Sequence, residues 1–417
     1  MRRHACLLAL VLASCTTAPT PCAAPPASAP TTDGQRWMAT WTASPQAPDA
    51  PLKLAGQTVR EIARVSLGGS RVRIRLTNAY GATSLRVGSA HVALHGSGAA
   101  IAPGSDRGVT FGGSRGVTIP PGALVVSDPV ALAVPASSEL AVSLYLPDAQ
   151  TAATEHSLAV QTTYVSAPGD FAGADTIADA ILTKSWYFLA GIDVASTGGE
   201  PASAAAIVTL GDSITDGYSS TRDANHRWPN FLSDRLNARQ GAPLRAVVNA
   251  AISGNRLLHD VIGQNALARL DRDVLSPGGA KYLIVLEGIN DIGAPTFLDR
   301  PEQEVTADDI IAGHRQIIER AHAAGLTVIG GTLTPFEGTT LPRYFTAGGE
   351  VKRQVVNAWI RTSKAYDAVI DFDRATRDPA NPARLSAAFD SGDHLHPNDA
   401  GYKAMAEAID LSLFDAR

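Results

Sequence analysis

Three residues in the second half of the chain have types and spacing suited to nucleophilic chemistry. Ser213 follows a glycine and an aspartate on a tight turn, and Asp393 and His396 lie three residues apart further along the chain. A neutral serine is a weak nucleophile and needs an adjacent base. His396 can supply that base, and Asp393, within one turn of it, can orient the imidazole. These residue types predict acyl transfer by a Ser-His-Asp triad.

Candidate donors for an oxyanion hole accompany the triad residues. An acyl-transfer intermediate needs hydrogen-bond donors aimed at its negatively charged oxygen. The backbone N–H groups of Ser213 and Gly254 and the side-chain amide of Asn290 are the candidates. Losing one such donor typically costs about 2.7–4 kcal/mol of transition-state stabilisation. We therefore predict that these three residues form an oxyanion hole.

Alternating strand and helix patterns over residues 201–417 determine where these side chains must lie. The apolar runs typical of buried strands are 204–210, 244–248, 282–286, 326–330 and 368–372. Amphipathic stretches lie between them, and one begins at a Thr306-x-x-Asp309 capping box and ends at Gly325. This alternation predicts a three-layer α/β domain with a parallel sheet. Ligands bind beyond the carboxyl ends of such strands, and the candidate residues follow strands at that edge.

Short strand patterns fill the preceding region, residues 36–200. Residues 58–67 and 71–77 alternate apolar with polar positions and are joined by Gly68-Gly69-Ser70, which predicts a hairpin. Further β-branched runs occur at 87–94, 117–119, 140–146 and 161–165. Regular short strands without helical periodicity predict a β-rich sandwich or jelly-roll-like domain.

The first 35 residues have the pattern of an export segment. Arg2 and Arg3 precede an apolar run over 7–12, as in a secretory signal. Residues 12–15 (Leu-Ala-Ser-Cys) resemble a bacterial lipobox, so we expect a signal over 1–15 and a lipid on Cys15; the alternative is an ordinary signal peptide cut further on. Residues 16–35 are rich in Pro, Ala and Thr and predict a flexible tether. We expect an exported protein, held at the cell envelope by a lipid that does not span the membrane, or otherwise periplasmic or secreted.

Composition limits the partners and cofactors. Of the 417 residues 18% are charged, the net charge is −5, and no long basic run is present, which argues against nucleic-acid binding. The three cysteines are Cys6, Cys15 and Cys22, so we expect neither a disulfide framework nor a cysteine metal site in the folded part. A two-metal phosphoesterase needs an Asp-x-His near the first strand and a later Gly-Asn-His, and the sequence has neither. No metal is expected.

Four ordered blocks resemble those of the SGNH (GDSL) hydrolase superfamily. They are Gly211-Asp212-Ser213, Gly254, Gly288-x-Asn290-Asp291 and Asp393-x-x-His396. The resemblance, over about residues 205–414, implies a flavodoxin-like three-layer domain and ester hydrolysis without a cofactor. It also implies catalysis by Ser213, His396 and Asp393, with Ser213, Gly254 and Asn290 as the oxyanion hole. The second block departs at Ala251, where members often have glycine, but Gly254 is intact.

The whole chain resembles a two-part bacterial subgroup of that superfamily, in which a β-rich half begins with a Trp-x-x-x-Trp segment, here Trp37 and Trp41. Its members include proteins similar to acetylxylan esterases, which implies an ester substrate, an acetylated oligo- or polysaccharide. One alternative is a lipase or lysophospholipase type of hydrolase. The alternative from another class is a glycan-binding surface lipoprotein with a vestigial catalytic domain.

Several neighbouring residues have competing interpretations. The Gly-x-Ser-x-Gly pattern over 112–116 imitates a nucleophile elbow, but it lies between two strand patterns, whereas an elbow needs a helix after it. His394 competes with His396 as the base, and we expect it to be a loop residue. Three aspartates beside the blocks are expected to be cap or turn residues: Asp212, Asp216 and Asp291. For Asp291 the alternative is a supporting role behind the catalytic residues. Three residues after the serine belong either to a polar loop or to the substrate rim: Arg222, Asn225 and Arg227.

Overall fold

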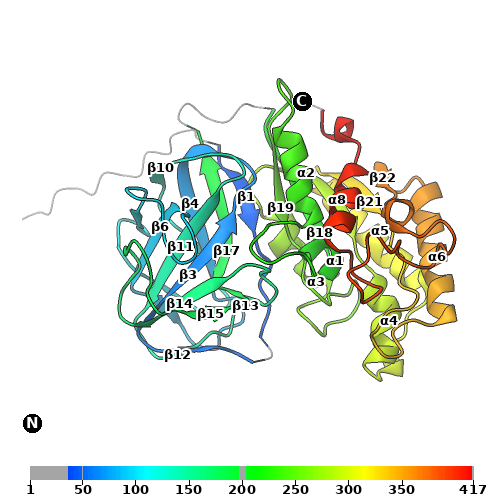
Figure 1. The fold of residues 1–417 in the computed structure, drawn as a ribbon, viewed down its shortest axis with the longest axis horizontal. Coiled ribbons are helices and arrows are strands. Elements are labelled where there is room, and N and C mark those ends of the chain that lie inside the picture. The colour runs from blue at the N-terminus through cyan, green and yellow to red at the C-terminus, as the bar shows by residue number, and fades with distance from the viewer. Residues whose placement is uncertain (1–35, 49, 197–202, 416–417) are drawn as a thin grey trace, which may run out of the picture. The chain divides into compact units, whose positions relative to one another are not determined.

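The computed structural model describes residues 36–48, 50–196 and 203–415 (Figure 1). The predicted export signal, Cys15 and the tether lie outside these residues, and so does the domain boundary predicted at residue 200. From Arg36 onward the described residues form one compact unit. Within the described ranges, no helix has the length and apolar character that crossing a membrane requires.

Two antiparallel sheets make up the first half. The five-stranded sheet contains β1 (Met38–Thr42), β17 (Leu189–Ala195), β4 (Gly69–Thr77), β10 (Val130–Val134) and β9 (Leu124–Val126). The six-stranded sheet runs in the order β15 (Ile181–Thr183), β14 (Thr163–Pro168), β3 (Gln57–Arg64), β11 (Glu139–Leu146), β6 (Ser89–Leu94) and β7 (Arg107–Val109). Three separate two-stranded sheets complete the first half: β2 (Lys53–Leu54) with β12 (Gln150–Thr151), β13 (Glu155–His156) with β16 (Trp186–Tyr187), and β5 (Leu85–Val87) with β8 (Val117–Ile119).

The two sheets share one apolar core. Ile74 and Ile192 from the five-stranded sheet are buried in the same cluster as Val59 and Leu144 from the six-stranded sheet. Side chains from two inner faces that meet in one core define a β-sandwich. The predicted β-rich sandwich is confirmed.

The hairpin predicted between residues 58 and 77 is wrong. Strand β3 pairs with β11 and β14, whereas β4 pairs with β17, β10 and β9, so the two strands belong to different sheets. The chain crosses between the sheets at Gly68, where an added Cβ would lie 2.4 Å from the carbonyl oxygen of Val134. The glycine that looks like a hairpin turn in the sequence allows a close backbone approach at this crossover.

The second half is built on a parallel sheet in the order β19-β18-β20-β21-β22. Its strands are β18 (Ala205–Gly211), β19 (Arg245–Asn249), β20 (Ala280–Leu286), β21 (Thr327–Gly331) and β22 (Ala368–Ile370). All five predicted strands are present. The order is the flavodoxin-like 2-1-3-4-5, whose switch point lies between β18 and β20.

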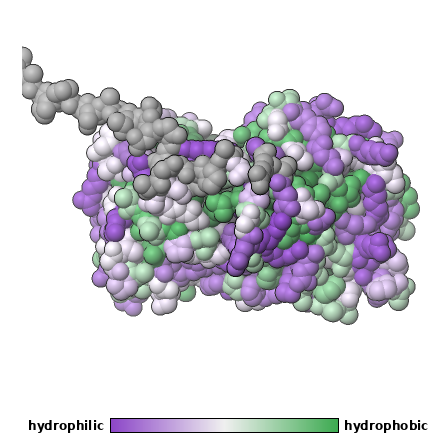
Figure 2. All heavy atoms as spheres, turned by 90° about the horizontal axis from the view of Figure 1, so that it is seen from above, coloured by the Kyte–Doolittle hydropathy of each residue, from purple (hydrophilic) through white to green (hydrophobic). Residues whose placement is uncertain are grey.

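Strand β18 is buried along its whole length, as expected for a parallel sheet in which both faces are covered. The helices are α1 (Ser213–Asp216), α2 (Trp228–Asn237), α3 (Ala266–Leu270), α4 (Ile289–Phe297), α5 (Ala307–Ala323), α6 (Ala347–Thr362), α7 (Phe372–Thr376) and α8 (Asp399–Glu407). The predicted capping box of α5 is confirmed: Thr306 Oγ1 accepts from the Asp309 N–H, and the Asp309 carboxylate accepts from the Thr306 N–H. The face of the molecule in Figure 2 mixes hydrophilic and hydrophobic residues.

Polar contacts join the sandwich to the α/β half. Strand β1 lies against β19, and Thr42 Oγ1 donates to the carbonyl oxygen of Asn249 at 2.8 Å. The backbone N–H of Val247, in β19, donates to Ser66 Oγ at 3.0 Å. The sandwich therefore abuts the edge of the sheet whose next strand, β18, leads to Ser213.

Candidate active site

Ser213, His396 and Asp393 form a continuous hydrogen-bonded chain. Ser213 Oγ lies 2.8 Å from His396 Nε2, and His396 Nδ1 lies 2.6 Å from Asp393 Oδ2. Since a carboxylate only accepts, Nδ1 carries a proton, and in the neutral ring Nε2 is then the acceptor for the serine hydroxyl. The arrangement gives a hydroxyl, a base and a carboxylate that orients the base.

The Asp393 carboxylate is held in its ionised form. Burial by itself would raise the pKa of Asp393, but hydrogen bonds from the His396 ring and from the backbone N–H groups of His396 and Leu395 bring it well below its ordinary value. Because the pKa of Asp393 is lower in the folded state than its ordinary value near 4, its pairing with His396 stabilises the fold fully above about pH 4. This contribution is lost as the pH falls through the pKa that Asp393 has in the folded protein.

A short turn after β18 presents the serine. Asp212 caps α1, and its Oδ1 accepts from the Ile214 N–H at 2.9 Å, as expected for a cap residue. Ser213 is therefore the first residue of α1, directly beyond the carboxyl end of the strand. Burial, with the nearby Asp291 and Asp216 carboxylates, raises the pKa of Asp212 to about 7.

Gly254 and Asn290 line the same pocket as Ser213 and His396. Gly254 has φ +77°, a left-handed backbone conformation that favours glycine, and a Cβ there would also displace the Ile262 side chain, whose Cδ1 would lie 2.5 Å away. It belongs to the loop that follows β19.

Two hydrogen bonds fix the Asn290 amide. Its Oδ1 accepts from the Tyr344 hydroxyl at 2.8 Å, and its Nδ2 donates to the carbonyl oxygen of Asn255 at 2.9 Å. A primary amide has two N–H donors, so the contact with Asn255 leaves one for a ligand. The structure thus brings together all three residues predicted for an oxyanion hole.

Asp291 supports the loop that carries Gly254. Its carboxylate accepts from the backbone N–H groups of Leu257 at 2.6 Å and Leu258 at 3.0 Å. Burial raises the pKa of Asp291 to about 6, although these hydrogen bonds oppose the rise. Asp291 therefore holds the loop after β19, which is the supporting role given as its alternative in the sequence analysis.

Residues 209–404 match the model of the GDSL-like Lipase/Acylhydrolase family. The α/β half of the chain belongs to this family. The protein is accordingly a carboxylic ester hydrolase, and the fold and family expected from the four blocks are confirmed.

Three solved structures illustrate what the hydrolase is similar to. A GDSL-like lipase from Bacteroides thetaiotaomicron is 20% identical, with 49% of this chain and 84% of that chain covered and a TM-score of 0.37. A catalytic mutant of an acetylxylan esterase from Geobacillus stearothermophilus is 22% identical, with 49% and 91% covered and a TM-score of 0.37. The aryl esterase of M. smegmatis is 18% identical, with 49% and 95% covered and a TM-score of 0.39. The search of curated proteins gave no match.

An apolar pocket opens at the serine of this GDSL-like hydrolase. Its volume is about 230 Å³. Besides the four site residues it is lined by Tyr218, Ser253, Arg256, Val261, Ile262, Ala294, Phe297, Leu298, Leu341, Tyr344 and Leu395. Val261, Ile262 and Phe297 are each between 37% and 41% exposed. Large apolar side chains therefore surround the mouth of the pocket.

The competing serine and histidine lie away from this pocket. His394 is half-exposed and its ring pairs with Asp390, whereas the Asp393 carboxylate pairs with the His396 ring. Ser114 lies in a turn between β7 and β8, with no helix after it. Among the described residues, no group of three or more His, Cys, Asp or Glu side chains could hold a metal ion.

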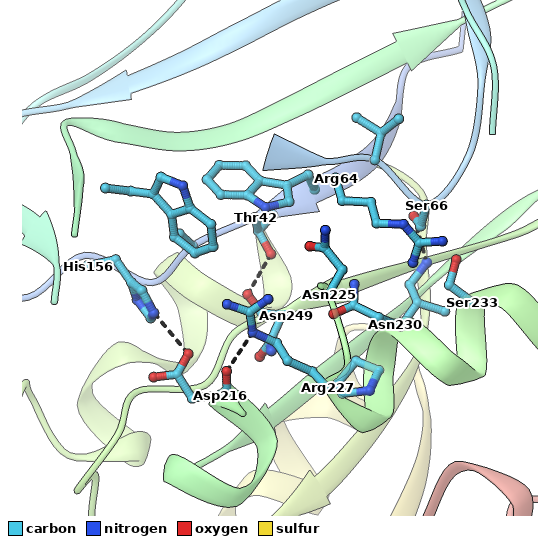
Figure 3. A pocket seen from close by; sticks show the side chains of 16 residues that line it. Thr42, Arg64, Ser66, His156, Asp216, Asn225, Arg227, Asn230, Ser233 and Asn249 are labelled. Carbon is cyan, nitrogen blue, oxygen red and sulfur yellow. Dashed lines mark hydrogen bonds and ion pairs between the residues drawn. The ribbon is translucent and has the colours of Figure 1, made fainter. Parts of the chain in front are cut away.

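A second pocket lies between the sandwich and the α/β half, where α2, the segment before it, β19 and Asp216 line it (Figure 3). Its volume of about 40 Å³ admits about three water molecules. Trp41 and Trp186 form one wall, packed edge to face with ring centroids 4.9 Å apart, and both are buried. This pocket is too small for a substrate.

The residues after the serine make internal contacts. Asn225 donates to Glu139, and Arg227 is buried with its Nε donating to the carbonyl oxygen of Asp216. Neither of these two residues lines the pocket at Ser213, and both line the smaller pocket instead. Arg222 is exposed.

Sequence reasoning missed several residues of the site. The Tyr218 ring packs against the His396 imidazole at a tilt of 39°, with ring centroids 4.3 Å apart, and its place five residues after Ser213 was the available signal. Tyr344, which donates to Asn290 Oδ1, is not part of any recognisable sequence motif. Asp216 was expected to bond local backbone, but its carboxylate pairs with His156 of the sandwich, 60 residues away. No local pattern links residues so far apart in the sequence.

Proposed function

We propose that this hydrolase cleaves esters through an acyl-enzyme formed on Ser213. The Ser213 oxygen attacks the ester carbonyl while His396 Nε2 takes the hydroxyl proton, and the N–H groups of Ser213, Gly254 and Asn290 stabilise the oxyanion. The C–O bond to the alcohol then breaks, and the alcohol leaves with the proton from His396. Water, deprotonated by His396, releases the carboxylic acid and regenerates the serine.

The observation that carries this proposal is the hydrogen-bonded chain from Ser213 Oγ to Asp393, at 2.8 and 2.6 Å. Its direct test is turnover of p-nitrophenyl acetate, with loss of activity after labelling by a fluorophosphonate. EDTA should leave the rate unchanged, because no step uses a metal. Absence of turnover by folded protein would instead favour the vestigial glycan-binding lipoprotein.

The pocket bears on the substrate. Its volume of about 230 Å³ exceeds the roughly 150 Å³ of an apolar cavity that binds benzene. An acetyl group alone would leave most of this space unfilled, whereas an aliphatic chain or an aromatic ring would contact Val261, Ile262 and Phe297. The lining therefore favours the lipase type of substrate, with an apolar group larger than acetyl. The acetylated carbohydrate, supported by the resemblance of the whole chain, is the second candidate.

We expect kcat/KM to rise with acyl length in a p-nitrophenyl ester series from acetate to octanoate. Each buried CH₂ contributes about 0.8 kcal/mol, or roughly fourfold in kcat/KM. Phe297→Ala should reduce the preference for hexanoate over acetate several-fold, because it removes part of the pocket wall. Acetate release from acetylated xylan oligomers, measured in parallel, tests the second candidate.

Phe171→Ala is the matched control for this series, since Phe171 and Phe297 are both 37% exposed and Phe171 lies in the sandwich. Its chain-length profile should equal that of the unchanged protein. A rate that is highest for acetate and falls steadily with length would contradict the apolar-group proposal.

We also propose export and lipidation of Cys15, which the lipobox-like residues 12–15 support. Cells grown with radiolabelled palmitate should label the unchanged protein and leave Cys15→Ser unlabelled. A secreted, unlabelled protein would instead indicate cleavage at an ordinary signal-peptide site.

A further inference from the structure

A buried histidine of the sandwich reaches the turn that carries Ser213. His156, in β13, lies with Nε2 2.9 Å from Asp216 Oδ1 and with Nδ1 3.0 Å from the carbonyl oxygen of Ser44. Figure 3 shows the imidazole pointing at the Asp216 carboxylate. Both neighbours can only accept hydrogen bonds, so both ring nitrogens donate and the imidazole carries a positive charge. Burial would lower the pKa of His156, but the Asp216 carboxylate raises it above its ordinary value.

The same carboxylate holds the loop that contains Gly254. Asp216 Oδ2 accepts from the backbone N–H of Ser253 at 2.9 Å and from its hydroxyl at 2.7 Å. Ser253 directly precedes Gly254, and Asp216 ends the helix that Ser213 begins. One carboxylate therefore joins the helix of the proposed nucleophile to the loop that supplies the second oxyanion donor.

Arg227 provides a second connection between the halves. Its Nε donates to the carbonyl oxygen of Asp216 at 2.7 Å, and its guanidinium also donates to the carbonyl oxygen of Ala159 in the sandwich. His156 and Arg227 thus surround Asp216 with two positive charges in a buried environment. Removing one partner of a buried ion pair leaves the remaining charge buried without compensation, which is strongly destabilising. Without His156, we therefore expect the Asp216 carboxylate to change its position.

We propose that the β-rich half completes the active site, with His156 as a positioning residue that fixes the Gly254 N–H through Asp216 and Ser253. This inference rests on the proposed function, because a correctly aimed Gly254 N–H matters only if an oxyanion forms. The oxyanion exists in the transition state and not in the bound ester, so misplacing its donor lowers kcat and leaves KM nearly unchanged.

The test compares kcat and KM of the full chain and its variants on one p-nitrophenyl ester. His156→Leu should lower kcat at least about tenfold, since complete loss of one oxyanion donor costs about 10²–10³. KM should stay within about twofold. His156→Gln, whose amide can still donate to Asp216, should recover part of the kcat. Ser253→Ala removes a single hydroxyl contact and should show the same pattern with a smaller loss.

His91→Leu is the matched control. His91 pairs with Asp106 at 2.9 Å in the sandwich and lines neither the pocket at Ser213 nor the smaller pocket beside Asp216. This variant should keep the full kcat even if its melting temperature falls. An equal loss of kcat in His91→Leu would overturn the proposal, because losing any histidine of the sandwich would then lower kcat whether or not it contacts Asp216.

Unchanged kcat in folded His156→Leu would also overturn the proposal. If His156→Leu does not fold, unchanged kcat in both His156→Gln and Ser253→Ala overturns it. Ser213→Ala separates this inference from the proposed function. An active Ser213→Ala would refute the proposed function, whereas an inactive Ser213→Ala with normal His156 variants would refute only the positioning role.

Discussion

Ser213→Ala is expected to abolish ester hydrolysis and to leave the fold intact. Loss of the nucleophile in a serine protease costs about 10⁶ in kcat, so we expect a fall of between about 10⁴ and 10⁶ here. The substitution removes one oxygen atom, the one that lies 2.8 Å from His396 Nε2. It keeps the Ser213 position at the start of α1, which Asp212 caps through the Ile214 N–H. The measurement is kcat on a p-nitrophenyl ester together with fluorophosphonate labelling, and both should be lost.

Ser114→Ala provides the matched control, because Ser114 has the Gly-x-Ser-x-Gly context of an elbow but lies exposed in a turn of the sandwich. Its kcat and its labelling should equal those of the unchanged protein. A substantial rate remaining in Ser213→Ala, with labelling retained, would refute the acyl-enzyme mechanism. Loss of labelling in Ser114→Ala would place the nucleophile in the sandwich.

The α/β half could be predicted because its strands are buried on both faces. A strand such as 282–286 must then be apolar at successive positions, and such runs stand out against the amphipathic helices between them. The blocks follow these strands, and parallel strands end at one edge of the sheet. The convergence of Ser213, Gly254 and Asn290 therefore follows from local patterns together with one rule of topology.

The sandwich was predictable as a class but not in its pairing. Alternation along β3 and β4 specifies strands, yet nothing local states that β4 pairs with β17, more than a hundred residues later. The glycines between them suit a tight turn and a close crossover equally well. In the folded chain the Val134 carbonyl oxygen lies so close to Gly68 that a side chain would not fit, and this contact cannot be inferred from the neighbouring residues alone.

The same distinction separates the predicted site residues from those that were missed. Ser213 and His396 are recognisable because their chemistry requires particular residue types. Val261 and Phe297 are apolar residues of the pocket wall, and apolar residues of this kind occur throughout the chain. His156 lies in an ordinary strand, and its contact with Asp216 depends on how the sandwich packs against the α/β half. Pocket walls and contacts between halves are tertiary properties that a linear pattern does not encode.

Asp393→Asn is expected to lower kcat about 10⁴-fold with little change in KM. The carboxylate accepts from His396 Nδ1 at 2.6 Å and thereby leaves Nε2 to accept the serine proton. An asparagine amide can donate to Nδ1 and so favours the tautomer with its proton on Nε2, which cannot act as the base. The equivalent substitution in a serine protease costs about 10⁴.

Asp390→Asn is the matched control for Asp393→Asn, because Asp390 pairs with His394 in the same loop. Comparing the two variants tests whether the loss of kcat is specific to the carboxylate that pairs with His396. That variant should keep kcat within a few-fold, since His394 contacts neither Ser213 nor His396. Retention of more than a tenth of kcat in Asp393→Asn would show that the carboxylate does not control the tautomer of His396. An equal loss of kcat in both variants would mean that the substitutions disturb the whole loop and would contradict a specific role of Asp393.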